Sequence, residues 1–109
     1  MLIVKMKNNI QKLQALKGEN FARVIVREQQ KFPYKSCEIM RGAYDDDENF
    51  TEDGKFHVVC SDYEIPPNTV REEVFENAED VFEKFLVNGK PLSEFTENID
   101  DSQIIIIDA

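Results

Sequence analysis

The sequence lacks the short motifs by which catalytic and cofactor sites are most readily recognised. It has no glycine-rich phosphate loop, no GxSxG motif and no paired CxxC, and it contains a single histidine, His57. A Cys/His hydrolase would have to combine this histidine with Cys37 or Cys60, but strict alternation along one strand places His57 and Cys60 on opposite faces. We therefore expect a protein that is not an enzyme and has no cofactor.

Long apolar runs are also missing. The two longest are residues 1–4 and 104–107, which are four residues each, whereas a membrane span needs about twenty. The first of them is shorter than the apolar region of an export signal. These shortages predict a cytoplasmic protein with no membrane partner, in which Cys37 and Cys60 are reduced, buried thiols.

A calcium loop is present only in part. Asp45, Asp47 and Asn49 offer oxygen ligands at alternate positions, as at the start of an EF-hand loop. The sixth position, however, is Phe50 and the twelfth is Phe56, where an EF-hand has glycine and glutamate. We therefore expect a solvated acidic loop and no metal site.

Charged residues are abundant, and basic and acidic residues are distributed unevenly along the chain. Residues 1–41 hold nine Lys/Arg and three Asp/Glu, whereas residues 42–109 hold four and nineteen, and the net charge is −9. The 109 residues, with 41% hydrophobic content and eight Phe, are enough for one core. We expect a single domain over residues 1–109 with a strongly acidic second part.

The first third of the chain predicts one helix and two strands. Asn8 or Asn9 can cap a short helix that ends near Gly18. Residues 21–27 then alternate with one strongly apolar face, and residues 35–41 alternate again, which indicates two strands.

The clearest local signal is a turn at Asp53-Gly54. This dipeptide favours the positive φ values of a two-residue type I′ hairpin, which would pair residues 50–52 with residues 55–57. Residues 56–63 continue as the return strand and are apolar on both faces, as a central strand would be. The acidic loop and this hairpin occupy about residues 43–55.

Two interpretations compete from residue 69 onward. Apolar residues between Val70 and Leu86 fit one long amphipathic helix. Alternatively residues 69–75 form a strand, and Asn77 caps a shorter helix that begins at Ala78. Both remain open at this stage.

The rest of the chain predicts a short helix and a strand. Asn88-Gly89 stops the preceding helix in a left-handed turn, and Pro91 starts a helix that includes Ile99. Residues 104–107 form a strand that is apolar on both faces, and therefore central in the sheet or paired with another copy. The fold class is α+β: an antiparallel sheet of about four to five strands with two or three helices packed on one face.

Partners are predicted from charge. The basic first third could contact phosphates, but the net charge of −9 opposes this, so we expect no direct nucleic-acid partner. We expect instead an inhibitor or immunity-type protein that docks a basic partner protein, such as a nuclease or nucleic-acid-binding protein. The alternative is a structural or assembly protein that forms a homo-oligomer through its Ile-rich terminal strand. The expected partner-binding residues are Asp45, Asp46, Asp47, Glu48, Glu72, Glu73, Glu76, Glu79, Asp80 and Glu83, with Tyr44, Phe50 and Tyr63 as aromatic anchors.

Overall fold

The computed structural model describes the backbone of residues 2–26, 31–62, 69–96 and 102–107, and the side chains of residues 8–26, 31–62 and 69–95. Its elements are three helices, five strands of one main sheet and two short hairpins. In chain order they are α1 (Leu2–Gln14), β1 (Phe21–Val26), β2 (Ser36–Met40), β3 (Ala43–Tyr44), β4 (Phe50–Thr51), β5 (Phe56–Ser61), β6 (Thr69–Phe75), α2 (Ala78–Lys84), β7 (Leu86–Val87), β8 (Lys90–Pro91), α3 (Leu92–Thr96) and β9 (Ser102–Ile107).

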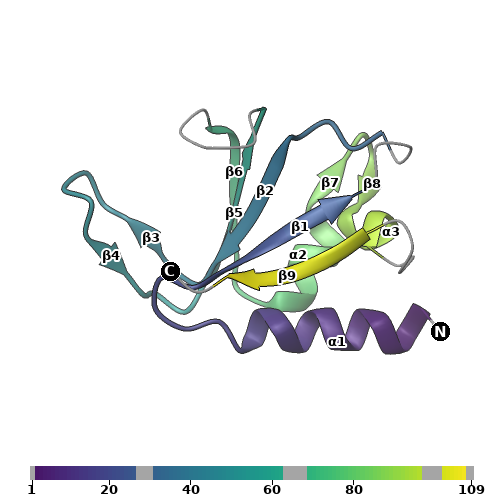
Figure 1. Ribbon diagram of the computed structural model, residues 1–109, viewed down its shortest axis with the longest axis horizontal. Coiled ribbons are helices and arrows are strands. Elements are labelled where there is room, and N and C mark those ends of the chain that lie inside the picture. Colours follow the sequence, from purple (N-terminus) through teal and green to yellow (C-terminus); the bar gives the residue numbers. More distant parts are fainter. Residues whose placement is uncertain (1, 27–30, 63–68, 97–101, 108–109) are drawn as a thin grey trace.

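The main sheet has the strand order β6-β5-β2-β1-β9, and every neighbouring pair is antiparallel. The three helices lie against one face of this sheet (Figure 1). Two small hairpins, β3–β4 and β7–β8, stand apart from it. The predicted α+β class, with an antiparallel sheet and helices on one face, is therefore confirmed.

The core lies between the sheet and the helices, and strand alternation selects its members. On the central strand β5, every second residue from Phe56 to Cys60 is buried toward the helices. Large side chains from the helices complete it, including Leu13 from α1 and Phe82 from α2, which are fully buried. One core thus fills the space between the two layers.

Helix α1 begins earlier than the sequence predicted. It starts at Leu2, so Asn8 and Asn9 lie inside it and neither is its cap. Asn9 is 2% exposed, with its Nδ2 atom buried and without a hydrogen-bond partner among the described residues. The asparagine pair does not mark the start of the helix, because the residues before it already form helical turns.

The segment from residue 69 follows the divided interpretation, and the long helix is wrong. Residues Thr69–Phe75 form β6, and α2 begins at Ala78. Asn77 occupies the N-cap position, but its side chain makes no capping hydrogen bond. Val70 and Val74 are 53% and 49% exposed, so the apolar residues that suggested a long helix do not all enter the core. Pairing with β5 decides the conformation, because antiparallel ladder bonds replace those of a helix.

Both predicted glycine turns have positive φ, but their roles differ from the prediction. The Asp53-Gly54 hairpin is wrong, since β4 pairs with β3 whereas β5 pairs with β2 and β6. Asn88 and Gly89 do not end a helix, because α2 ends at Lys84. With φ values of 53° and 80° they instead form the two-residue turn of the β7–β8 hairpin.

Strand β9 lies at the edge of the sheet, next to β1, and the expectation of a central position is wrong. Ile99 lies outside the described residues. Within the described part of the chain, no helix has both the length and the apolar character needed to cross a membrane.

Candidate functional site

The acidic arm, which we define as residues 43–51, projects from the end of the main sheet (Figure 1). It consists of β3, a five-residue acidic tip and β4, and its two strands pair through Ala43 with Thr51 and Tyr44 with Phe50. Every residue of the tip, from Asp45 to Asn49, is exposed. The structure therefore brings the first predicted acidic cluster together on one outward-facing element.

The tip is ordered by its own first carboxylate. Asp45 Oδ1 accepts hydrogen bonds from the backbone N–H groups of Asp47 and Asn49, both at 2.9 Å. Two backbone bonds close the turn, from Asp45 N–H to Asn49 O and from Glu48 N–H to Asp45 O. Asp45 thus shapes the turn, whereas the carboxylates of Asp46, Asp47 and Glu48 are left to face solvent.

Two predicted anchors, Tyr44 and Phe50, form an aromatic pair directly below the tip. Their ring centroids are 5.2 Å apart with an interplanar angle of 68°, which is an edge-to-face arrangement. Tyr44 remains 48% exposed. A hydrogen bond to Glu19, together with partial burial and the negative charge of that carboxylate, raises the pKa of Tyr44. The third anchor, Tyr63, lies outside the described residues.

The base of the arm is closely packed around Gly42. A Cβ atom at this position would lie 2.3 Å from Thr51 O, 2.7 Å from Phe50 Cζ and 3.0 Å from Glu52 Cα. Only glycine allows β4 to approach so closely. Next to it, the Arg41 guanidinium donates hydrogen bonds to Gln14 O at 2.9 Å and to Gly54 O at 3.4 Å, which ties the arm to the end of α1.

A second contact fixes the turn that follows the arm. Asp53 Oδ1 accepts a hydrogen bond from Lys55 N–H at 2.9 Å, and Asp53 Oδ2 lies 2.9 Å from His57 Nε2. Although burial alone would raise the pKa of Asp53, these two partners outweigh it and hold that pKa below its usual value. In the sequence, the Asp53-Gly54 pair indicated the turn but not the contact between Asp53 and His57.

The second predicted acidic cluster is divided in the structure. On the long-helix interpretation its six members would lie along one helix, but Glu72 and Glu73 lie on β6, Glu76 lies in the connection, and the remaining three lie on α2. Glu73 forms an ion pair with Arg71, and Asp80 forms one with Lys84. This cluster is therefore spread over three segments and partly neutralised, in contrast to the acidic arm. The three members on α2 are Glu79, Asp80 and Glu83.

The cysteines and the histidine occupy different faces of the sheet. Cys37 and Cys60 are fully buried on the helix-covered face, with their Sγ atoms 3.7 Å apart. His57 alternates to the other face and contacts Asp53. The structure therefore does not bring a cysteine and the histidine together.

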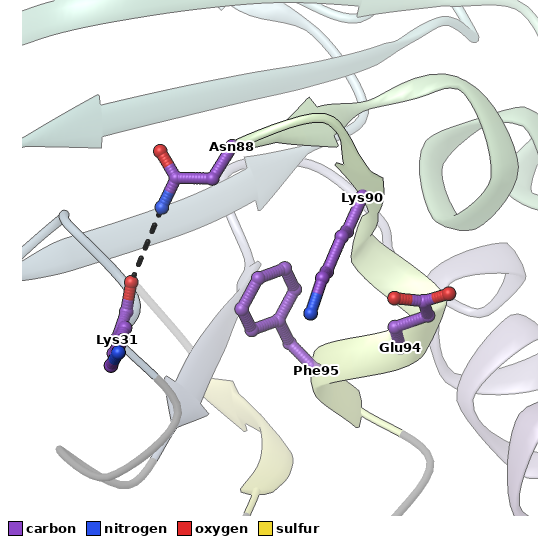
Figure 2. Close-up of a pocket in the computed structure, with 5 residues that line it drawn as sticks. All are labelled: Lys31, Asn88, Lys90, Glu94 and Phe95. Atoms are coloured by element: carbon purple, nitrogen blue, oxygen red, sulfur yellow. Dashed lines mark hydrogen bonds between the residues drawn. The ribbon is translucent and has the colours of Figure 1, made fainter.

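A small cavity of about 180 Å³ lies between β8, α3 and the segment before β2 (Figure 2). The lining residues are Lys31, Asn88, Lys90, Glu94 and Phe95. Asn88 Nδ2 donates a hydrogen bond to Lys31 O at 3.4 Å and so links two of the segments that line the cavity (Figure 2). The cavity is smaller than the 300–1,000 Å³ typical of ligand pockets.

The acidic arm does not bring its carboxylates together as a metal site would. Among the residues that the structure describes, no group of three or more His, Cys, Asp or Glu side chains converges on a common point. Sequence reasoning found the charged tip but missed Gly42, Arg41 and Glu19, which position it. The signal that could have revealed the arm was the five turn-forming residues between Ala43-Tyr44 and Phe50-Thr51.

Comparisons with protein-family models, with curated proteins and with solved structures found no match to this chain.

Proposed function

We propose that this protein is a cytoplasmic, non-enzymatic interaction module of the inhibitor or immunity type, and that its acidic arm docks a basic protein partner. The observation that carries the proposal is the concentration of exposed carboxylates on a projecting, internally ordered element. Among the described residues, none of the ion pairs includes Asp46, Asp47 or Glu48. Their charge is therefore available to attract and orient a cationic surface.

The arm also supports the proposal through its rigidity and its aromatic pair. Hydrogen bonds within the tip and the packing at Gly42 reduce the conformational entropy that binding would remove. Tyr44 supplies exposed aromatic area next to the carboxylates. The carboxylates would attract a basic partner, and the Tyr44 ring would pack against its surface. A nuclease or nucleic-acid-binding protein offers the basic surface required, whereas nucleic acid itself would be repelled by the net charge of −9.

The test compares two triple variants with the same change of charge. In the arm variant, Asp46→Asn, Asp47→Asn and Glu48→Gln remove three tip charges, and Asp45 is kept because it orders the turn. In the control variant, the exposed residues Glu72, Glu76 and Glu83 are each changed to Gln. Partners captured from host lysate by the original protein are identified, and the affinity of each purified partner is measured at low and high ionic strength.

We expect the arm variant to bind between about threefold and about 150-fold more weakly, because three exposed charges each contribute about 0.2–1 kcal/mol. The control variant should bind almost as well as the original protein, and binding by both should weaken as salt rises. Equal affinity of the original protein and the arm variant, or an affinity independent of salt, would show that the arm is not the docking element.

A second candidate function is self-association through β9, and the comparison of the two sheet edges favours it. Edge strand β6 carries Arg71, Glu72 and Glu73, and its pairing with β5 shifts register at Cys60/Ser61, which are features that hinder pairing between sheets. Strand β9 has no charged residue and pairs with β1 in continuous register. Sedimentation across a wide concentration range would detect a dimer. The dimer should be abolished by Ile105→Lys and unaffected by Val70→Lys on the opposite edge, and a monomer throughout would exclude this function.

A further inference from the structure

The cysteine pair is placed for a covalent bond that its thiols do not yet form. Cys37 on β2 and Cys60 on β5 are directly opposite in the antiparallel register, and their Sγ atoms are 3.7 Å apart. Directly opposite residues in such a ladder have Cα atoms about 4.5–5.5 Å apart, which lies within the 4.4–6.8 Å that a disulfide requires. Rotation of the two side chains would be enough to join them, with no movement of the strands.

The geometry points to Cys37 and Cys60 as a redox-active dithiol that a small-molecule disulfide, such as oxidised glutathione, converts to a disulfide between β2 and β5. In the first step one protein thiolate attacks the reagent, so that a mixed disulfide forms and one glutathione thiolate leaves. In the second step the other protein thiolate attacks the mixed disulfide and releases the second glutathione. Two protein thiols are oxidised, one disulfide is reduced to two thiols, and the two protons pass to the departing thiolates.

The order of the two steps follows from the position of each cysteine in the sheet. Cys37 lies on β2, which has β1 on one side and β5 on the other, whereas Cys60 lies next to the edge strand β6. Its partner on β6 is Arg71, whose side chain is 25% exposed, so only this edge strand separates Cys60 from solvent on that side of the sheet. Cys60 is therefore the thiol that the reagent reaches first, when the β6 edge opens.

The folded protein protects the pair, so the reaction is slow in the native state. Contact with Cys60 and complete burial raise the pKa of the Cys37 thiol well above its usual value, although Arg71 opposes this. Both cysteines are 0% exposed. Oxidation therefore needs transient opening of the sheet, and once formed the bond is shielded from reductants in the same way.

The disulfide would close a loop that contains the acidic arm. Residues 43–51 lie between the two cysteines in the chain, and β2 and β5 carry the two ends of this segment. Oxidation would therefore fasten the strands from which the arm projects and raise the stability of its base. This inference concerns the fold and does not depend on the docking function, since the bond forms whether or not the arm has a partner.

The experiment treats the full reduced chain with oxidised glutathione in a urea concentration just below the unfolding midpoint, and then returns it to native buffer. Intact-mass measurement should show a monomer that has lost two hydrogens, and digestion without reductant should link the peptides of β2 and β5. We expect Tm to rise on the order of 10 °C and to return to its starting value after reduction. Dimers, separate glutathione adducts on both cysteines, or an oxidised monomer with unchanged or lower Tm would overturn the proposal.

Single variants test the order of attack. In Cys37→Ser the reaction should stop at a glutathione adduct on Cys60, because the second thiol is missing. In Cys60→Ser the remaining thiol should be modified several-fold more slowly, since Cys37 lies on the central strand β2, which two strands separate from the solvent at either edge of the sheet. Faster modification of Cys60→Ser than of Cys37→Ser would refute entry from the β6 edge, and the double variant Cys37→Ser/Cys60→Ser controls for changes of Tm caused by the reagent alone.

Discussion

Substitution of Gly42 by alanine tests whether the acidic arm depends on close packing at its base. The new methyl carbon would lie 2.3 Å from Thr51 O, about 1 Å closer than the roughly 3.3 Å of a normal C···O contact. Thr51 O is a backbone atom, so rotation of a side chain cannot relieve this contact. The strands of the arm must separate, or β4 must move away from the end of β2.

The expected cost follows from the nature of these contacts. Overpacking of a filled site costs about 1–3 kcal/mol, and a collision with backbone belongs to the upper part of that range. An unhindered Gly→Ala change would instead stabilise the protein by about 0.4–1 kcal/mol, because it restricts the unfolded chain. The net loss is therefore about 2 kcal/mol, which lowers the urea midpoint by about 1 M and Tm by about 10 °C.

Urea unfolding measures the global effect, and hydrogen exchange at the Asp45 amide measures the arm itself, because that N–H group donates to Asn49 O across the arm. A useful control is Gly18→Ala, where φ is +55° and no atom lies within 4 Å of the new Cβ. This change strains only its own backbone, by about 1 kcal/mol, and should leave exchange at Asp45 unaltered.

In the Gly42→Ala background, Phe50→Leu should restore only part of the loss, since it removes the contact with Cζ but not the contact with the backbone. A Gly42→Ala protein with an unchanged urea midpoint and unchanged exchange would refute the packing argument.

Two further predictions concern contacts that hold the fold around the arm and the sheet edge. Because Asp53 has a lowered pKa in the folded state, its stabilising effect is present above the unfolded value near 3.9 and is lost as pH falls through the lower folded value. Asp53→Asn should therefore flatten the fall of stability between about pH 4 and pH 2, measured by urea unfolding at each pH; an unchanged slope would show that its contact with His57 does not persist in solution. The Arg71 guanidinium lies 3.9 Å from the centroid of the Phe85 ring. Arg71→Met should therefore lower the free energy of unfolding in urea by about 2 kcal/mol. Arg71→Lys should lower it nearly as much, because a lysine ammonium group cannot stack on the ring as the planar guanidinium group does. Full stability of Arg71→Lys would argue that only the charge matters.

The strands were predictable where alternation reflected burial on one face. In β1, Ala22 and Val24 are buried while Ile25 is 38% exposed, so the apolar face of the sequence pattern is the face that meets the helices. In β2, Cys37 and Ile39 behave in the same way. In these strands the apolar residues are the ones that are buried, and for that reason the α+β class could be inferred from the sequence alone.

The segment from residue 69 could not be decided, because its residues satisfy two periods at once. Val70 and Val74 are four residues apart, as on a helix, and also fall an even number apart, as on one face of a strand. The exposed fraction of both valines shows that neither is held in place by the core. Pairing with β5 settles the conformation, and that pairing is a long-range contact which no local pattern contains.

The turns show the same division between local and long-range information. Gly54 and Gly89 both adopt positive φ, as an Asp-Gly or Asn-Gly pair predicts. Only the turn at Gly89 joins two strands that pair with each other, because β5 finds longer partners in β2 and β6 than the short segment before Gly54 could offer. The dipeptide specifies how the chain turns, whereas the competition among strands decides what the turn connects.

The two acidic clusters differ for a related reason, and this difference bears on function. The carboxylates of residues 45–48 are consecutive, so any turn that exposes one of them places the others nearby, and the prediction of a concentrated patch needed only a local turn. The carboxylates between Glu72 and Glu83 are spaced, so their alignment depended on one long helix, of which only the part from Ala78 onward forms. Arg71 and Lys84 neutralise two of these carboxylates. A basic partner that recognises this protein by charge should therefore respond to the arm and be nearly indifferent to the second cluster, whose members are spread over three segments and partly neutralised.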